Sequence, residues 1–207
     1  MYICGDVKCK IMKANEETAD LMRDIYYPLL KKSSVTRLAS ILIPMSLKKN
    51  DILLRESEIS DRIYFVKTGL LRQHYYKNDK DLTEHFASEN TSIMSIESFI
   101  FQEPSYLIIE AMEPTELFAI PREPLMSLAR KHADLGLLYT RIVECILVGI
   151  QRKIESIRSQ SAVERFLHFK TECPKLFTRV PLLYIASYLL MSPETLSRIR
   201  SVLLTET

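Results

Sequence analysis

No stretch of this 207-residue chain approaches the roughly 18 consecutive apolar residues that a membrane-spanning helix requires. The first residues, Met1–Lys13, also lack the apolar core of a secretory signal, because charged residues lie on both sides of Val7. We therefore expect a cytoplasmic protein without a membrane partner. The composition, with 47% hydrophobic and 26% charged residues, is that of an ordinary globular protein.

Cysteine is scarce, with four residues in the chain. Cys4 and Cys9 form a C-x4-C pair that could begin a metal or iron–sulfur site. Such a site needs about four ligands, and Cys145 and Cys173 fall in unrelated helical segments. We therefore expect free, reduced thiols, with no metal ion and no cofactor.

Histidine is equally scarce, and this weighs against a metal-dependent jelly-roll enzyme. Such an enzyme needs two or three histidines that converge with a carboxylate on a metal ion. Only His74 and His85 lie in the strand-rich region, and they form no H-x-H pair. The pair Glu84–His85 is the remaining catalytic candidate. We expect no enzymatic activity and no catalytic residue, and we keep the jelly-roll enzyme as an alternative.

Short strand-like segments follow one another between Met45 and Pro121, separated by turn residues. Asn78–Asp79 predicts a hairpin tip, and residues 96–101 predict a short helical bend. The repeated short strands predict an antiparallel roll. The predicted strands are Ile52–Leu54, Ile63–Val66, Leu70–Tyr76, Leu82–Phe86, Tyr106–Ile109 and Glu116–Ile120.

Helical patterns flank this region on both sides. Glu16–Lys32 and a segment from Ser34 to Pro44 precede it, and a long helix is expected from an N-cap at Asp134 to about Arg158. Apolar residues recur along the long helix in alternating steps of three and four, which suits a seam with a second copy of the chain. Packing against the roll alone is the alternative. The predicted dimer residues are Leu135, Leu138, Ile142, Cys145, Ile146 and Gly149.

The most specific pattern is a helix-turn-helix in Pro181–Leu203. The motif requires apolar residues at fixed offsets and one small residue where its helices cross. Ser192 is a suitable N-cap for the second helix, and Pro193 fits its first position. The apolar set is Ile185, Leu189, Met191, Leu196 and Ile199, and the small residue is Ala186.

The outward face of the second helix is expected to enter the major groove of double-stranded DNA. Arg198 can bind guanine through two hydrogen bonds, and Glu194 can accept one from cytosine. Ser192, Thr195 and Arg200 are placed for phosphate contacts, and Ser197 and Ser201 share the outward face. Residues 151–207 contain nine Lys or Arg and five Asp or Glu, so their net charge is +4. Residues 1–150 contain nineteen Lys or Arg and twenty-one Asp or Glu, so their net charge is −2. This basic C-terminal part suits nucleic-acid binding.

The chain resembles the CRP/FNR family (cyclic-AMP receptor and fumarate–nitrate regulators) over about residues 25–203. The resemblance rests on S-x-E-T-x-x-R at Ser192–Arg198 and on the roll opening LKKNDILLRESEISDRIYFVKTGLLR at 47–72, with Gly69 at a turn. It implies a homodimer that binds a two-fold-symmetric operator and contacts RNA polymerase. Pro193 replaces a frequent arginine of the family and Leu190 replaces a frequent turn glycine. We expect no β-wing after the second helix, and little room for a hairpin in 173–180.

The cyclic-nucleotide cassette of the family is incomplete in this chain. Glu97 matches its glutamate, but Ile96 replaces the glycine and residues 102–106 contain no arginine. Without that cation a buried phosphate would lack a positive partner, at a cost of several kcal/mol. We therefore expect no regulation by cyclic AMP. Glu97 remains the candidate for the pocket of an unknown small-molecule effector.

These observations predict an α+β chain. An N-terminal double-stranded β-helix or jelly roll, like a cyclic-nucleotide-binding domain, precedes a long dimerisation helix and a C-terminal helix-turn-helix domain without an evident wing. The predicted boundaries are 1–123 for the sensor domain, 124–159 for the connecting and dimerisation helices, and 160–207 for the DNA-binding domain. The predicted function is sequence-specific transcription regulation. A dimeric interaction module with degenerate DNA binding is the second alternative.

Overall fold

The computed structural model describes residues 3–205, and the side chains of residues 9–202. The chain folds into two compact units. The first contains residues 1–71 and 87–146, and the second contains residues 72–86 and 147–207. The domain boundaries expected from the sequence stay a prediction.

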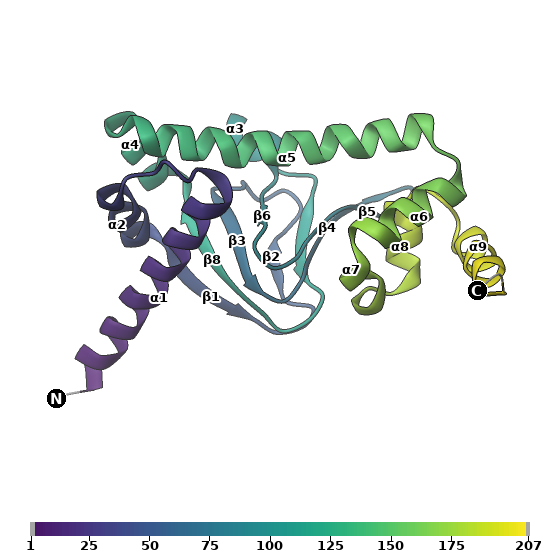
Figure 1. Cartoon of the computed structure of the whole chain (residues 1–207), viewed down its shortest axis with the longest axis horizontal. Coiled ribbons are helices and arrows are strands. Elements are labelled where there is room, and N and C mark those ends of the chain that lie inside the picture. Colours follow the sequence, from purple (N-terminus) through teal and green to yellow (C-terminus); the bar gives the residue numbers. More distant parts are fainter. Residues whose placement is uncertain (1–2, 206–207) are drawn as a thin grey trace. The chain divides into compact units, whose positions relative to one another are not determined.

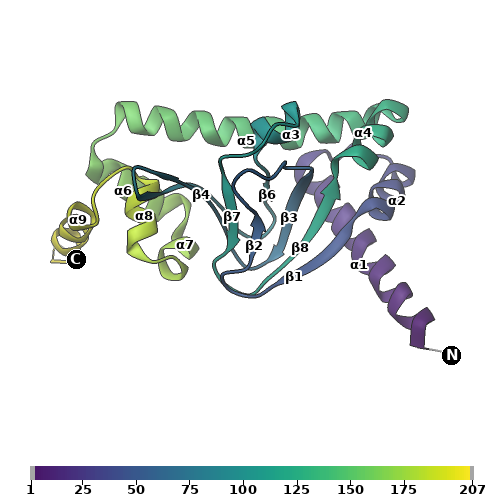
Figure 2. The ribbon, with the colours of Figure 1, turned by 180° about the vertical axis from the view of Figure 1, so that it is seen from behind.

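The first unit contains the strands β1, β2, β3, β6, β7 and β8 of a β-roll, with helices packed against them (Figure 1). One sheet has the strand order β1-β8-β3-β6, and the other has the order β2-β7-β4-β5 (Figure 2). The mixed jelly-roll class that was predicted is confirmed. The strands are β1 (Ile43–Leu47), β2 (Ile52–Leu54), β3 (Arg62–Thr68), β4 (Leu71–Lys77), β5 (Lys80–Ala87), β6 (Ser92–Ile93), β7 (Ile108–Ala111) and β8 (Thr115–Pro121).

Two apolar clusters hold the roll together. One lies between the sheets and includes Leu54, Val66 and Ile109, each at most 3% exposed. The other joins the sheet to the surrounding helices around Phe65 and Leu38, both 0% exposed. The helices of this unit are α1 (Ile3–Tyr26), α2 (Lys32–Ile41), α3 (Ile96–Phe101), α4 (Arg122–Lys131) and the first half of α5 (Ala133–Ser159).

Two prolines correct the predicted boundaries. The helix expected over Glu16–Lys32 ends at Tyr26, because Pro28 disfavours helical geometry in the residue before it. Pro44 was expected to close the second helix, but it lies inside β1. Strand β1 is at the edge of its sheet and pairs only with β8, so a residue without an N–H is tolerated there. Strand β1 was therefore missed, and the two-residue strand β6 was missed as well.

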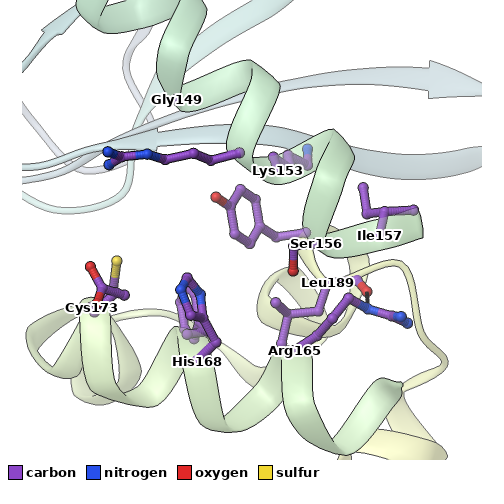
Figure 3. A pocket seen from close by; sticks show the side chains of 12 residues that line it. Gly149, Lys153, Ser156, Ile157, Arg165, His168, Cys173 and Leu189 are labelled. Carbon is purple, nitrogen blue, oxygen red and sulfur yellow. Dashed lines mark hydrogen bonds between the residues drawn. The ribbon is translucent and has the colours of Figure 1, made fainter. Parts of the chain in front are cut away.

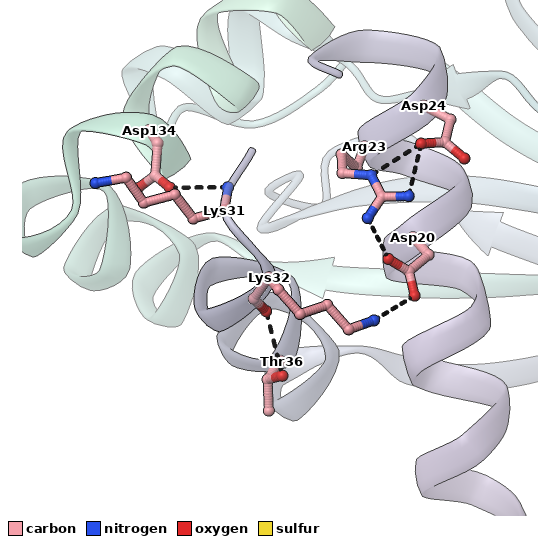
Figure 4. A network of polar contacts seen from close by, with 7 residues as sticks. All are labelled: Asp20, Arg23, Asp24, Lys31, Lys32, Thr36 and Asp134. Atoms are coloured by element: carbon pink, nitrogen blue, oxygen red, sulfur yellow. Dashed lines mark hydrogen bonds and ion pairs between the residues drawn. The ribbon is translucent and has the colours of Figure 1, made fainter. Parts of the chain in front are cut away.

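Polar contacts fix α1, α2 and the start of α5 (Figure 4). Arg23 binds Asp20 and Asp24 on α1, and Lys32 of α2 reaches Asp20 at 2.7 Å. Asp134 was expected as the N-cap of α5, but the helix begins one residue earlier. In the first turn its carboxylate accepts the backbone N–H of Lys31 at 3.4 Å, so it joins α5 to the start of α2.

The second unit contains the β4–β5 hairpin from Arg72 to Phe86, the second half of α5 and the C-terminal helices. Asn78 and Asp79 have φ values of 49° and 59°, as a two-residue type I′ turn requires, so the predicted hairpin tip is confirmed. Residues 174–179, where little room for a hairpin was expected, are helical. The helices are α6 (Ala162–Glu172), α7 (Pro174–Arg179), α8 (Leu182–Tyr188) and α9 (Pro193–Thr205).

Candidate nucleic-acid interface

Helices α8 and α9 form the predicted pair of short helices joined by a tight turn. Ile185, Ala186 and Leu196 are 0% exposed, and Leu189 and Ile199 are 6% and 8% exposed. Met191, the remaining member of the apolar set, is half-buried. Because the buried residues come from both helices, the two helices pack on each other through the offsets that the motif requires. The side chain of Leu203 lies outside the described residues.

The turn between the helices adopts left-handed backbone geometry at Leu190, with φ of 51°. The N–H of Met191 donates to the carbonyl of Ala186 and the N–H of Leu190 donates to that of Ser187, which is the Schellman pattern of a helix end. Arg165 of α6 donates to the carbonyl of Leu189 at 2.9 Å. The turn thus forms despite the leucine, whose side chain is 53% exposed.

The start of α9 agrees with its predicted signals. Ser192 accepts the backbone N–H of Thr195 through its Oγ at 3.1 Å, and Pro193 is the first helical residue. Glu194 follows in the first turn, where its own backbone N–H and the Ser192 hydroxyl lower the pKa of its carboxyl group. The N-cap prediction is therefore confirmed.

The predicted DNA-facing residues lie mostly on the exposed side of α9. Ser192, Glu194, Ser197, Arg198, Arg200 and Ser201 are exposed, and Thr195 is half-buried. Arg198 lines a groove that also contains Ala162 and Val163 of α6. The Arg200 guanidinium lies 5.6 Å from the centre of the Phe177 ring on α7, so this side chain turns back toward its own domain.

Sequence reasoning missed the support that α6 gives to the motif. Ser161 and Glu164 form a capping box at the start of α6, in which each side chain binds the other residue's backbone N–H. This box places Arg165 in the first turn, where it binds the turn carbonyl of Leu189. The S-x-x-E spacing was readable in the sequence and could have located the helix start.

The β4–β5 hairpin is a second element that sequence reasoning did not associate with the motif. Arg72 of β4 is 1% exposed and binds both carboxylate oxygens of Asp81 on β5 at 2.8 Å. Its guanidinium carbon lies 3.8 Å from the centre of the Tyr184 ring on α8. The hairpin therefore packs on the first helix of the motif. The pairing spans distant sequence, which no local pattern signals.

The second half of α5 contacts the same helix and hairpin. Lys153 donates to the carbonyl of Glu84 at 2.6 Å, and its ammonium lies 4.7 Å from the Tyr188 ring centre. Burial and the charge of Lys153 lower the pKa of His85 to about 4. The pair Glu84–His85 is thus a neutral imidazole beside an ion-paired carboxylate, a poor arrangement for general acid–base catalysis near neutral pH.

A pocket of about 140 Å³ lies between α5, α6 and α8. Figure 3 shows Lys153 and Ser156 of α5 opposite Arg165 and His168 of α6. Burial and the nearby charge of Glu172 raise the pKa of the Cys173 thiol, and burial raises the pKa of Tyr188 to about 12. These shifts make both groups weaker nucleophiles near neutral pH.

The cysteines form no metal centre within the described part of the chain. Among the residues that the structure describes, no group of three or more His, Cys, Asp or Glu is placed to hold a metal ion. Cys9 and Cys145 are exposed free thiols, and Cys173 is half-buried. The side chain of Cys4 lies outside the described residues, so the absence of a metal site at the C-x4-C pair stays a prediction.

The residues of the predicted dimer seam on α5 differ in exposure. Leu135, Leu138 and Ile142 are at most 1% exposed and belong to the core of their own chain. Their own chain covers these three side chains, so their part in a dimer seam stays a prediction. Of the other predicted residues, Ile146 is half-buried, and Cys145 and Gly149 are exposed. The apolar side chains that α5 leaves exposed are Leu137, Leu147, Val148 and Ile154.

The predicted effector residue Glu97 lies in the first turn of α3 with its side chain exposed. Beside it, the buried hydroxyl groups bind one another and the backbone: Ser105 binds Ser95 at 2.9 Å, and Ser98 accepts the N–H of Ser60 at 2.9 Å. Glu97 therefore faces solvent, while the hydroxyl groups of Ser95, Ser98 and Ser105 are engaged in internal hydrogen bonds.

Within the described part of the chain, no helix is both long and apolar enough to cross a membrane.

The roll itself matches a known family model. Residues 44–132 match the model of the cyclic nucleotide-binding domain. The structure of FixK2 from Bradyrhizobium japonicum is similar over 80% of this chain and 86% of that one, with a TM-score of 0.70 and 20% sequence identity. The chain has the fold of a CRP/FNR regulator. The predicted resemblance is thus confirmed for the fold.

Two further solved structures share this CRP/FNR fold. The c-di-GMP-responsive global regulator CLP from Xanthomonas campestris has a TM-score of 0.67 and 17% identity, over 85% of this chain and 93% of that one. A protein from Eubacterium rectale, assigned to the Crp/Fnr family of transcriptional regulators, has a TM-score of 0.66 and 20% identity, over 87% and 88% of the two chains. No curated protein sequence matches the chain.

Proposed function

We propose that the chain is a cytoplasmic, sequence-specific DNA-binding regulator of transcription with no enzymatic activity. The observation that carries the proposal is the division of α9 into two faces. Leu196 and Ile199 are buried, whereas Glu194, Ser197 and Arg198 are exposed. A helix anchored in this way presents a fixed set of polar side chains to the major groove.

Each exposed side chain is given a role by its chemistry. Arg198 binds guanine through two hydrogen bonds, and Glu194 accepts a hydrogen bond from cytosine. Ser192 and Thr195 bind phosphate at the start of the helix, and Arg200 binds phosphate from its position over Phe177. Ser197 and Ser201 complete the surface that faces the bases.

The regulator acts as a homodimer through α5. The exposed Leu137, Leu147, Val148 and Ile154 give this helix an apolar surface that one chain leaves uncovered, and exposed Cys145 and Gly149 border it. A two-fold dimer presents two recognition helices to half-sites about one DNA turn apart. The family resemblance adds RNA polymerase as a partner of the DNA-bound dimer.

Cyclic AMP does not regulate this protein. Ile96 stands where the cassette needs a glycine, residues 102–106 contain no arginine, and Ser95 and Ser105 bind each other. A cyclic phosphate there would lose its hydration without gaining a cation. Titration with cyclic AMP should leave the DNA affinity unchanged, and a tighter complex would contradict this part of the proposal. An unidentified small molecule remains the candidate effector.

Selection of random duplexes by the purified protein tests the function directly. Fluorescence anisotropy at two salt concentrations should detect an enriched palindrome. Arg198→Ala should reduce the preference for the selected site by about 1–3 kcal/mol, because a bidentate base contact is lost. Arg200→Ala is the matched control, since loss of a phosphate contact should weaken selected and random duplexes alike.

Two results would contradict the proposal. Equal losses for Arg198→Ala on selected and random DNA would make Arg198 a phosphate contact only. Weak binding without sequence preference, in the absence of any effector, would favour the dimeric interaction module with degenerate DNA binding.

A further inference from the structure

The helix-turn-helix segment is poor in cations for a DNA-binding element. No Lys or Arg occurs between Arg179 and Arg198, a stretch that includes α8, the turn and the first half of the recognition surface. DNA affinity depends strongly on the number of phosphates that Lys and Arg neutralise. Any further cation beside the start of α9 would have to come from a different part of the chain.

The β4–β5 hairpin is fastened to α8 by hydrogen bonds as well as by Arg72. The backbone N–H of Thr83 donates to the Ser187 Oγ at 2.8 Å. The same hydroxyl donates to the carbonyl of Asp81 at 3.2 Å. The phenyl ring of Phe86 lies 5.4 Å from the ring of Tyr188, also on α8. These contacts fix the hairpin with respect to the helix-turn-helix.

The end of the hairpin shares a groove with the turn of the motif. The groove has a volume of about 660 Å³. Lys80 and Leu82 of β5 line it together with Leu190 of the turn and with Ser192 and Pro193 at the start of α9. Lys80 is therefore a cation beside the start of α9 that is placed for phosphate contact.

A second lysine lies next to the first. Lys77 and Lys80 flank the two-residue turn Asn78–Asp79, and a two-residue hairpin places its flanking residues opposite each other on one face. Both side chains are exposed, and neither forms an ion pair with a residue that the structure describes. Two such ammonium groups side by side match the repeated negative charge of a DNA strand.

We propose that the β4–β5 hairpin is a DNA-backbone contact of this regulator, in which Lys77 and Lys80 bind phosphates next to the bases read by α9. The inference rests on the proposed DNA-binding function. In this arrangement the β4–β5 hairpin, which belongs to the strand-rich part of the sequence, contacts DNA directly. The apolar side chains of Leu82 and Leu190 line the groove between the hairpin end and the turn.

The test is the salt dependence of DNA binding by the double variant K77Q/K80Q. Each phosphate contact adds about 0.9 to the slope of log affinity against log salt, so the variant should lose up to about 1.8 of slope. At about 0.1 M salt this corresponds to a loss in affinity of about 10- to 60-fold. Selected and random duplexes should lose equally, because phosphates carry no sequence information. The charge-matched control K48Q/K49Q, in an exposed turn of the roll, should leave the slope unchanged.

Each result decides the question. A shallower slope for K77Q/K80Q alone supports the hairpin contact. An unchanged slope, or the same loss in the control, overturns it. Tighter binding by K77Q/K80Q also overturns it and would make the hairpin a shield over the recognition helix. A wild-type chain that binds no duplex overturns the proposed function first, and the hairpin contact with it.

Discussion

Different interactions stabilise the β-roll and the C-terminal unit. The roll buries two large apolar clusters, in which Phe65, Val66 and Leu38 are 0% exposed. The C-terminal unit attaches its hairpin through a buried ion pair, a cation over an aromatic ring and hydrogen bonds to one serine. Apolar packing is roughly proportional to buried area, whereas the polar contacts depend on single partners. The comparison predicts that the roll is sensitive to lost volume and the hairpin to lost partners.

The largest effect is expected in the roll. Phe65→Ala should lower the free energy of unfolding by about 3–5 kcal/mol, because it removes a fully buried ring and leaves a cavity. Urea unfolding followed by circular dichroism would measure it. Phe101→Ala is the matched control, since this ring is 67% exposed and should cost under about 0.5 kcal/mol. Similar midpoints for the two variants would contradict the contrast.

The hairpin is expected to depend on Asp81. Asp81→Asn leaves the guanidinium of Arg72 buried without its carboxylate, at a cost of about 2–4 kcal/mol in the C-terminal unit. Thermal unfolding would record the shift. Asp79→Asn, in the exposed tip, removes the same charge and should be nearly neutral. If the two variants melt alike, the ion pair does not hold the hairpin.

His85 should make the C-terminal unit sensitive to acid. Burial first, and then the charge of Lys153, lower the folded-state pKa of His85 to about 4, below its ordinary value of 6.5. The unfolded chain therefore binds the proton more readily, so this stability is complete above pH 6.5 and is lost as the pH falls toward 4. Between neutrality and about pH 5 we expect a loss of about 1–2 kcal/mol.

Unfolding measured across this pH range should be flatter for His85→Gln than for the wild type. The exposed His168 provides the control His168→Gln, which should keep the wild-type slope. Parallel curves for all three proteins would mean that His85 is protonated equally in both states.

The smallest effect is expected at the turn of the motif. Leu190→Gly should stabilise the protein by about 0.5–1 kcal/mol, because a leucine has a steric cost at a φ of 51° that glycine avoids. Leu190→Ala keeps the Cβ atom and should bring no such gain. Differential scanning calorimetry would separate them. A loss of stability in Leu190→Gly would show that the exposed leucine side chain contributes packing in the groove.

Sequence alone determined the elements whose signals are local. Ser192 and Pro193 specify the start of α9, Asn78–Asp79 specify the hairpin tip, and the apolar offsets of the motif specify its buried side. Each signal depends on residues within about one turn of helix or one hairpin, so it is readable without knowledge of the rest of the chain. The same holds for most of the strands.

Tertiary structure decided which partner each surface meets. The sequence shows Leu135, Leu138 and Ile142 as an apolar stripe with helical spacing. That spacing is equally compatible with packing against a second copy and with packing against the chain's own roll. In the structure these residues pack in the roll core. The pairing of Arg72 with Tyr184 joins segments more than a hundred residues apart, which no local pattern can specify. The spacing of apolar residues along a helix predicts which face is buried, because apolar side chains avoid water. It does not fix what covers that face, because the covering surface comes from distant residues whose positions only the folded chain determines.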